Sequence, residues 1–247
     1  MSGKIVVLKH VGSEGPGTIA DFFANTKWDL SVIDLGRESA LLGELTNIDG
    51  IVSMGGPMNA YEEELYPFLK DEIAFLKKAV EEEIPTIGIC LGAQLLARSC
   101  GATVKRAEEE EIGWYDVELT EDGLRDPLFS GIPAKIRVFQ WHHDTFEIPA
   151  GGTLMAKGRG CLNQAFKVGA NAYGLQFHVE VTPQMITSWI RECGELREGA
   201  ADILFECYEG REALRELTEK LCLNFSRMIS VSQRSATGRT PAGHKTF

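Results

Sequence analysis

Three residues of the sequence could together perform acyl-transfer chemistry: Cys90, His178 and Glu180. Cys90 follows the short apolar run IPTIGI and precedes LGAQLLA, a segment with helical spacing. This pattern predicts a strand, a tight turn and a helix, with the cysteine at the helix N-terminus. Backbone N–H groups and the positive end of the helix dipole favour a thiolate there. Gly88 and Gly92 are small enough to allow such a turn beside a nucleophile.

A base for this thiol is available in the segment GLQFHVE, residues 174–180. If the segment is a strand, its alternation places Gln176, His178 and Glu180 on one face. The carboxylate can then fix the tautomer and orientation of the imidazole, leaving the other ring nitrogen for the thiol. Taken alone, a cysteine at a strand end usually packs in the core, and a His-x-Glu pair is typically a surface pair. Their combination favours a catalytic triad.

An oxyanion hole would complete the site, and the sequence offers two backbone donors. The N–H of Leu91 directly follows the predicted nucleophile, and the turn in MGGPMN can aim the N–H of Gly56 at the same point. The alternative interpretation of Gly55, Gly56 and Pro57 is an ordinary turn at the end of a strand.

Apolar runs alternate with helical patterns through the first hundred residues. This alternation is typical of a parallel sheet covered on both faces, with ligands beyond the carboxyl ends of the strands. We expect strands at 4–10, 29–35, 48–54 and 84–89, a short helix capped by Thr18, and an amphipathic helix with apolar positions from Leu65 to Val80. Gly101 suits the C′ position of the helix after Cys90.

The pattern changes after Gly101. Shorter runs predict mixed or antiparallel strands at 103–104, 114–119, 136–141, 153–156, 164–168 and 172–177. From Pro183 to residue 229 the spacing is helical, and we expect these helices to pack on the sheet, with an interaction surface as the alternative. The sequence predicts one domain, residues 1–230, followed by a disordered tail, residues 231–247.

Composition limits the possible functions. The chain of 247 residues is 44% hydrophobic and carries a formal net charge of −11, which argues against nucleic-acid binding. Acidic runs at 62–64, 81–83 and 108–111 are interpreted as solvated faces. We find no membrane-spanning run and no signal pattern, and therefore expect a cytoplasmic protein without a membrane partner. Its six cysteines have neither disulfide-framework nor zinc-ligand spacing, so we expect no metal and no cofactor.

Five motifs carry a resemblance to a known family: GGPMN, GICLGAQ, EIGW, QWHHD and QFHVE. In order and spacing they resemble the class I, triad-type glutamine amidotransferases, and in particular stand-alone proteins similar to the amidotransferase domain of GMP synthase. The resemblance implies an α/β three-layer sandwich, a mostly parallel mixed sheet flanked by helices, here with a C-terminal helical extension. The usual proline between the histidine and the glutamate is Val179 here, and His143 stands where many relatives have glycine.

The resemblance also assigns roles to residues. It implies a Cys90–His178–Glu180 triad and an oxyanion hole from Gly56 and Leu91. It further implies glutamine recognition around one set of residues, Gly55, Gln94, Trp141 and His142. Asp144 is left open between a functional role, in which it orients His142 or helps to hold the substrate, and a simple turn carboxylate. His10, beside Glu14 near a rim loop, is interpreted as structural.

The implied reaction is hydrolysis of the glutamine side-chain amide through a cysteine thioester, giving glutamate and ammonia. No SGGxDS-type nucleotide loop occurs, so we expect a separate synthetase partner to use the ammonia. A second hypothesis is direct hydrolysis of a γ-glutamyl peptide or amide. A third, from another class, is a binding or regulatory module that has lost turnover.

Overall fold

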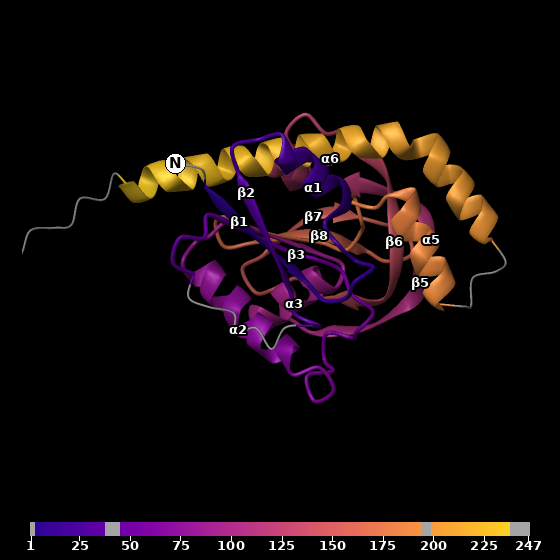
Figure 1. The fold of residues 1–247 in the computed structure, drawn as a ribbon, viewed down its shortest axis with the longest axis horizontal. Coiled ribbons are helices and arrows are strands. Elements are labelled where there is room, and N and C mark those ends of the chain that lie inside the picture. Colours follow the sequence, from indigo (N-terminus) through magenta and orange to yellow (C-terminus); the bar gives the residue numbers. More distant parts are fainter. Residues whose placement is uncertain (1–2, 38–44, 194–198, 238–247) are drawn as a thin grey trace, which may run out of the picture.

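A mixed sheet of nine strands forms the centre of the computed structural model, which describes residues 3–37, 45–193 and 199–237 (Figure 1). In sequence order the strands are β1 (Lys4–Lys9), β2 (Asp29–Asp34), β3 (Gly50–Ser53), β4 (Thr86–Ile89), β5 (Val104–Leu119), β6 (Lys135–Phe146), β7 (Thr153–Lys157), β8 (Asn163–Val168) and β9 (Ala172–Leu175). In space their order is β2-β1-β3-β4-β9-β8-β7-β5-β6.

The sheet is parallel in one half and antiparallel in the other. Strands β2, β1, β3, β4 and β9 pair in parallel, with Val52 beside Ile87 and Ile89 beside Leu175. From β9 onward, β8, β7, β5 and β6 pair antiparallel. The carboxyl ends of β3, β4 and β9 therefore meet at one edge, where ligands bind in folds of this kind.

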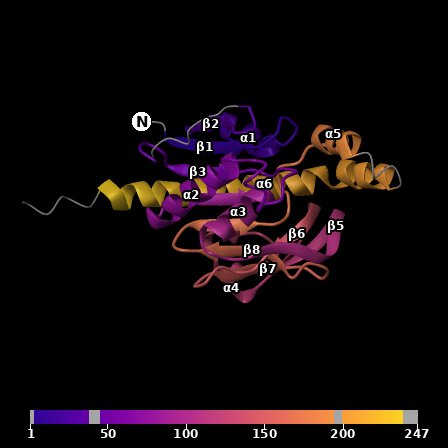
Figure 2. The same cartoon turned by 90° about the horizontal axis from the view of Figure 1, so that it is seen from below.

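Helices cover both faces of the sheet, which makes the predicted three layers (Figures 1 and 2). The helices are α1 (Gly17–Ala24), α2 (Phe68–Glu81), α3 (Leu91–Ser99), α4 (Glu121–Arg125), the 3₁₀ turn η1 (Pro127–Phe129), α5 (Pro183–Cys193) and α6 (Ala200–Thr237). Leu76 of α2 and Leu95 of α3 belong to the core on one face. Phe23 of α1 and Phe225 of α6 belong to the core on the other. Full burial of each such side chain stabilises the fold by about 1.5–3 kcal/mol.

The long helix α6 confirms the predicted C-terminal helical extension and its packing on the sheet. Its buried side chains, including Cys207, Leu214 and Leu221, lie in the same core as α1. The helix continues through Thr237, into the first residues of the segment expected to be a disordered tail. Residues 238–247 lie outside the described part. None of the described helices is long and apolar enough to cross a membrane.

Two local predictions near the N-terminal half were wrong. Thr18 does not cap α1: Pro16 occupies the cap position, and Thr18 instead donates its backbone N–H to the carbonyl of Glu180 at 2.9 Å. Leu65 lies before α2, which begins at Phe68 after Pro67, and its side chain is exposed. Proline is favoured where helices begin because a backbone N–H there has no acceptor within the helix, so the N–H that proline lacks is not missed.

Two predictions in the second half also need correction. The runs at 103–104 and 114–119 belong to one long strand, β5, whose pairing with β6 shifts register between Arg106 and Glu111. The acidic run 108–111 is not wholly solvated, because that shift turns Glu111 into the interior with 2% of its surface exposed. The segment 174–180 is not a continuous strand either: β9 ends at Leu175 and the chain bends before His178.

Candidate active site

Cys90 lies at a sharp corner between β4 and α3. Its φ of 50° and ψ of −107° place a residue other than glycine in a strained backbone conformation, which is typical of a nucleophile held at a strand-to-helix turn. The backbone N–H of Cys90 donates to the carbonyl of Leu175 at 2.8 Å, and that of Gly92 donates to Met54 at 3.0 Å. These bonds fasten the corner to the ends of β9 and β3.

The glycines on either side of Cys90 are required by close backbone approach. A Cβ on Gly88 would collide with the backbone of Gly92, and a Cβ on Gly92 would collide with the backbone of Ser53. The small residues predicted from the sequence thus allow α3 to start directly against the end of β3.

His178 and Glu180 form a buried pair beside this corner. Nδ1 of His178 lies 2.7 Å from Oε1 of Glu180, and the other carboxylate oxygen accepts the N–H of Val179 at 3.0 Å. The backbone N–H of His178 donates to the carbonyl of Phe139 at 2.8 Å. The ring of Trp189 packs edge-on against the imidazole, with the two ring centroids 5.1 Å apart. Although β9 has ended, these contacts hold the imidazole and carboxylate in the arrangement expected from their spacing.

The charge state of His178 follows from its neighbours. Burial alone would lower its pKa, but the negative charges of Glu180 and of a Cys90 thiolate outweigh burial and raise the pKa well above its ordinary value. The imidazole can therefore hold a proton beside the sulfur, which is the arrangement that makes a cysteine nucleophilic.

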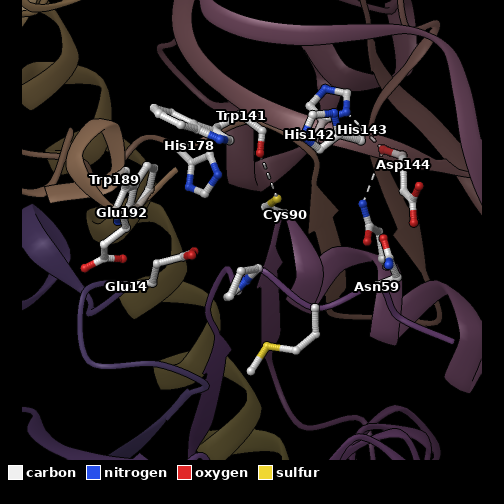
Figure 3. A pocket seen from close by; sticks show the side chains of 14 residues that line it. Glu14, Asn59, Cys90, Trp141, His142, His143, Asp144, His178, Trp189 and Glu192 are labelled. Atoms are coloured by element: carbon white, nitrogen blue, oxygen red, sulfur yellow. Dashed lines mark hydrogen bonds between the residues drawn. The ribbon is translucent and has the colours of Figure 1, made fainter. Parts of the chain in front are cut away.

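A cavity of about 350 Å³ opens around Cys90 (Figure 3). Its lining residues are Glu14, Gly56, Pro57, Met58, Asn59, Cys90, Gln94, Trp141, His142, His143, Asp144, His178, Trp189 and Glu192. Sγ of Cys90 lies 3.8 Å from the carbonyl oxygen of Trp141. The cavity is large enough for an amino-acid side chain to reach the sulfur.

The two predicted oxyanion donors are the backbone N–H groups of Leu91 and Gly56. Leu91 is the first residue of α3, so its N–H has no acceptor within the helix. Gly56 lines the cavity, and the carbonyl of Gly55, in the same peptide unit as the Gly56 N–H, lies 2.8 Å from Nδ1 of His10. His10 thereby contacts the glycine turn. Its other ring nitrogen, Nε2, lies 2.7 Å from a carboxylate oxygen of buried Glu72.

The sequence profile of the family described as glutamine amidotransferase class-I matches residues 18–193. The chain belongs to this family.

Individual relatives agree with this assignment. The structure is similar to a crystal structure of a glutamine amidotransferase from Thermotoga maritima, with 35% identity and a TM-score of 0.84 over 93% of this chain and 99% of that one. The sequence is 29% identical over 222 residues to the glutamine amidotransferase-like protein YfeJ of Salmonella typhimurium, covering 89% and 90% of the two chains. It is 32% identical over 177 residues to one subunit of the glutamine-hydrolysing GMP synthase of Pyrococcus abyssi, covering 66% and 89%.

The predicted substrate-binding residues of this amidotransferase differ in whether they line the cavity and whether their polar atoms are free to bind a substrate. Gln94, Trp141 and His142 line the cavity, whereas Gly55 borders it without lining it. The ring nitrogens of His142 are both engaged, Nδ1 with the carbonyl oxygen of Asp144 at 2.9 Å and Nε2 with Glu111 at 3.0 Å. His142 therefore shapes the wall and has no ring nitrogen left for a substrate.

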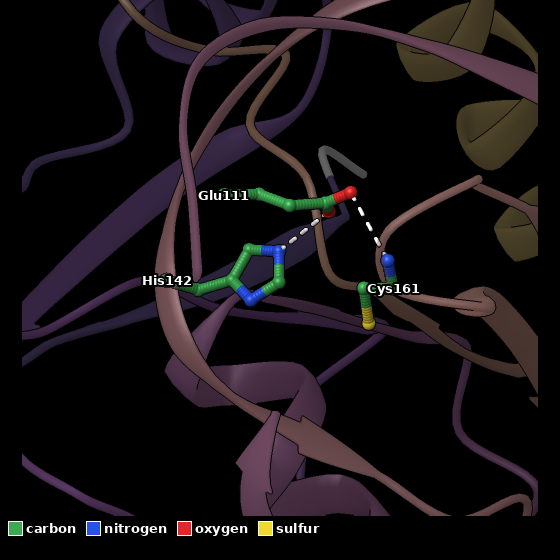
Figure 4. Close-up of side chains that lie close together, drawn as sticks. All are labelled: Glu111, His142 and Cys161. Atoms are coloured by element: carbon green, nitrogen blue, oxygen red, sulfur yellow. Dashed lines mark hydrogen bonds and ion pairs between the residues drawn. The ribbon is translucent and has the colours of Figure 1, made fainter. Parts of the chain in front are cut away.

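Glu111, His142 and Cys161 form a buried cluster whose possible metal-ligand atoms lie within 4.8 Å of one another (Figure 4). Each is already satisfied by hydrogen bonds. Besides His142, Glu111 accepts the N–H of Cys161 at 3.1 Å and the amide of Gln164 at 2.7 Å. The Cys161 thiol donates to Thr145 at 3.1 Å, and burial raises its pKa. The cluster acts as a hydrogen-bonded support for His142.

Two carboxylates in the cavity are Asp144, whose role was left open from the sequence, and Glu14, which was given none. Asp144 is 4% exposed, and neither of its carboxylate oxygens has a hydrogen bond of ordinary geometry among the described residues. Its neighbour is Tyr61, whose pKa is raised by burial, by the negative charge of Asp144 and by a side-chain hydrogen bond with Asp144. Glu14 lies on the far side of Cys90, near His178. The sequence signal that could have placed Glu14 in the site is its position after β1, at the same edge of the sheet as Cys90.

Proposed function

We propose that the protein hydrolyses the side-chain amide of glutamine or a related γ-glutamyl amide, with Cys90 as nucleophile. The observation that carries this proposal is the strained Cys90 corner beside a buried His178–Glu180 pair separated by 2.7 Å. Membership of the class I glutamine amidotransferase family supports it. A thiol nucleophile requires reduced sulfur, which suits the cytoplasm.

In the first half of the reaction, the Cys90 thiolate adds to the γ-carbonyl carbon of the substrate. The resulting oxyanion accepts hydrogen bonds from the N–H groups of Gly56 and Leu91, each worth about 3 kcal/mol in the transition state. Nε2 of His178 gives its proton to the leaving nitrogen, the C–N bond breaks, and a γ-glutamyl thioester remains on Cys90.

In the second half, water attacks the thioester carbon. His178 takes a proton from this water, the C–S bond breaks, and glutamate leaves with the thiolate–imidazolium pair restored. Glu180 holds the imidazole in the required tautomer and stabilises its positive charge in both halves.

Asp144 is proposed to bind the α-ammonium group of the glutamyl portion. A buried carboxylate without partners is costly unless a ligand cation completes it. Gln94 lies beside it, donating its side-chain amide to the Asp144 carbonyl at 3.3 Å. Asp144 lies away from His178 across Cys90 (Figure 3), so the glutamyl portion would enter from that side and the leaving nitrogen would face His178.

We further propose that released ammonia serves a separate acceptor-modifying partner. The relative from Pyrococcus abyssi is named as a subunit of glutamine-hydrolysing GMP synthase, which supports an arrangement of two separate chains. The second candidate is direct hydrolysis of larger γ-glutamyl amides, favoured by the extension of the cavity past His178 to Glu14, Trp189 and Glu192.

The nucleophile is tested by replacing Cys90 with serine. Release of ammonia from glutamine, or of amine from a γ-glutamyl peptide, should fall to background, and unchanged turnover would refute the assignment. Comparing the two substrates separates the candidates, because only direct hydrolysis should be efficient without a partner. A module without turnover would also leave Cys90 unlabelled by a glutamine-analogue diazo-ketone, whereas the proposed enzyme should be labelled at that residue.

A further inference from the structure

The cavity continues on both sides of Cys90, and each side carries a carboxylate (Figure 3). On one side lies Asp144, proposed above to bind the glutamyl portion. On the other side, past His178, lie Glu14, Trp189 and Glu192. A site built only for glutamine needs room for a single nitrogen on the His178 side, so this second group of residues calls for an explanation.

Glu14 is held directly beside the general acid of the proposed reaction. A Cβ on Gly55 would lie 2.6 Å from Oε2 of Glu14 and 3.0 Å from Cε1 of His178, so the missing side chain of Gly55 leaves space for this carboxylate. Since Nδ1 of His178 is bound to Glu180, Nε2 is the atom that serves the leaving nitrogen. The adjoining Cε1 edge of the ring faces Glu14. The leaving nitrogen therefore departs next to Glu14.

The loop that carries Glu14 is fastened to helix α5. The indole N–H of Trp189 donates to the carbonyl of Ser13 at 3.1 Å, and the Ser13 hydroxyl donates to Glu192 at 2.9 Å. These bonds keep Glu14 and Glu192 on the same wall. The side chain of Glu14 takes no hydrogen bond from any residue in the described part of the chain, so its oxygens remain available to a ligand.

The chemistry of this wall suits an alkylammonium ion. Two carboxylates supply negative charge, and Trp141 and Trp189, whose rings are perpendicular with centroids 5.8 Å apart, supply apolar surface and π-faces. Burial, helped by the charges of Glu180 and Glu192, raises the pKa of Glu14 to about 7 in spite of His178 and His10. A bound cation would stabilise the ionised carboxylate.

We infer that the His178 side of the cavity binds a positively charged substituent on the leaving amine, so that the preferred substrates are γ-glutamyl amides of diamines. This inference rests on the proposed function. The α-ammonium group would pair with Asp144, and the distal ammonium group of the amine with Glu14 and Glu192. Of the two candidates given above for the fate of the leaving nitrogen, this arrangement favours direct hydrolysis of γ-glutamyl amides over ammonia transfer, because carboxylates beside the departing nitrogen favour ammonium, which has no lone pair to attack an acceptor.

The reaction balances as a hydrolysis. Cys90 sulfur bonds to the γ-carbonyl carbon, the C–N bond breaks, and His178 protonates the diamine nitrogen that leaves. Water then replaces sulfur on the carbonyl carbon, giving glutamate and the free diamine. No oxidant, reductant or further reactant is required.

The test compares three γ-glutamyl amides of similar length, made from 1,4-diaminobutane, n-pentylamine and 4-aminobutanoate. Their leaving groups carry a positive, neutral and negative end. We expect kcat/KM for the diamine amide to exceed that for the neutral amide by at least about tenfold, with the anionic amide poorest. Equal values for the first two amides in the wild-type protein would overturn the inference.

The variants Glu14→Gln and Glu192→Gln test the wall itself. Each should lower the ratio of kcat/KM for the diamine amide over the neutral amide by about threefold to tenfold. Glu216→Gln, an exposed position on α6 that removes the same charge, should leave the ratio unchanged. A ratio unaffected in both cavity variants would contradict the inference, and the exposed position of Glu192 makes misfolding of its variant a poor explanation.

The outcomes separate this inference from the proposed function. Cys90-dependent cleavage of glutamine and the neutral amide without a preference for the cation would reject only the diamine inference. Absence of cleavage for every amide, glutamine included, together with no labelling of Cys90, would reject both.

Discussion

Nδ1 of His10 lies 2.8 Å from the carbonyl oxygen of Gly55, and His10 is not one of the residues that line the cavity. A carbonyl only accepts, so Nδ1 carries a proton. Nε2 faces the carboxylate of Glu72 at 2.7 Å, and the second oxygen of Glu72 accepts the Ser53 hydroxyl at 2.6 Å. Burial would lower the pKa of His10, but the charge and hydrogen bond of Glu72 raise it above its ordinary value.

This contact fixes the orientation of a proposed oxyanion donor. The peptide unit is planar, with C=O and N–H pointing in opposite directions. If His10 holds the Gly55 carbonyl on one side, the Gly56 N–H must point to the other, toward the cavity that Gly56 lines. We therefore predict that His10, interpreted from the sequence as structural, positions this donor for the proposed reaction.

Two substitutions of His10 separate positioning from stability. An asparagine amide can replace Nδ1 and donate to Gly55, whereas a glutamine amide can replace Nε2 and reach only Glu72. Both remove the positive charge beside Glu72 and should lower the free energy of unfolding by similar amounts. His10→Gln should also lower kcat for γ-glutamyl amides by at least about tenfold relative to His10→Asn, with similar KM values. Equal kcat values would show that His10 does not orient the turn.

Replacing Glu180 with glutamine removes the charge that raises the His178 pKa. We expect kcat to fall by about 100-fold or more, because the imidazole loses the group that fixes its tautomer and stabilises its charge. Alkylation of Cys90 by iodoacetamide should slow at pH 7 and recover at higher pH, since His178 no longer holds a proton beside the sulfur. An unchanged pH profile of alkylation would contradict the proposed role of Glu180.

The sequence was most informative where function depends on local spacing. The Cys90 corner could be predicted because the flanking glycines and the apolar run lie within a few residues of it. His178 and Glu180 were correctly paired although the strand assumed for them ends at Leu175, because two residues of separation suffice for contact in either backbone.

Features that depend on tertiary packing could not be predicted in the same way. In the run 108–111 four identical glutamates are indistinguishable by pattern, and the register shift in β5 decides that Glu111 turns inward. Asp144 is distinctive only because both its carboxylate oxygens are buried without a hydrogen bond of ordinary geometry. Glu14 is distinctive because Gly55, which has no side chain, leaves space for the Glu14 carboxylate beside His178. Neither property is visible in a single segment.

Replacing Asp144 with asparagine should weaken substrate binding without lowering the stability of the fold. In Asp144→Asn, loss of the charge should raise KM for glutamine by about 10- to 100-fold with a smaller change in kcat. The free energy of unfolding should stay the same or increase, because a buried unpaired charge is removed. Thermal unfolding and steady-state kinetics measure the two effects, with exposed Asp21→Asn as the control. Lower stability with an unchanged KM would instead indicate a structural carboxylate.

The preference for a cationic leaving group should depend on pH through Glu14. The pKa of Glu14 is raised to about 7, chiefly by burial, with Glu180 and Glu192 acting in the same direction and His178 and His10 opposing them. Its ionised fraction therefore increases from about a tenth at pH 6 to about nine tenths at pH 8, while the substrate amine, with a pKa near 10, stays charged.

The ratio of kcat/KM for the diamine amide over the neutral n-pentyl amide should accordingly rise severalfold between pH 6 and pH 8. Titration of His178 affects both substrates alike and cancels in the ratio. In Glu14→Gln the ratio should be low and nearly independent of pH, whereas Glu216→Gln should retain the wild-type rise. A wild-type ratio that stays constant over this range would mean that the ionised Glu14 carboxylate does not contact the leaving amine.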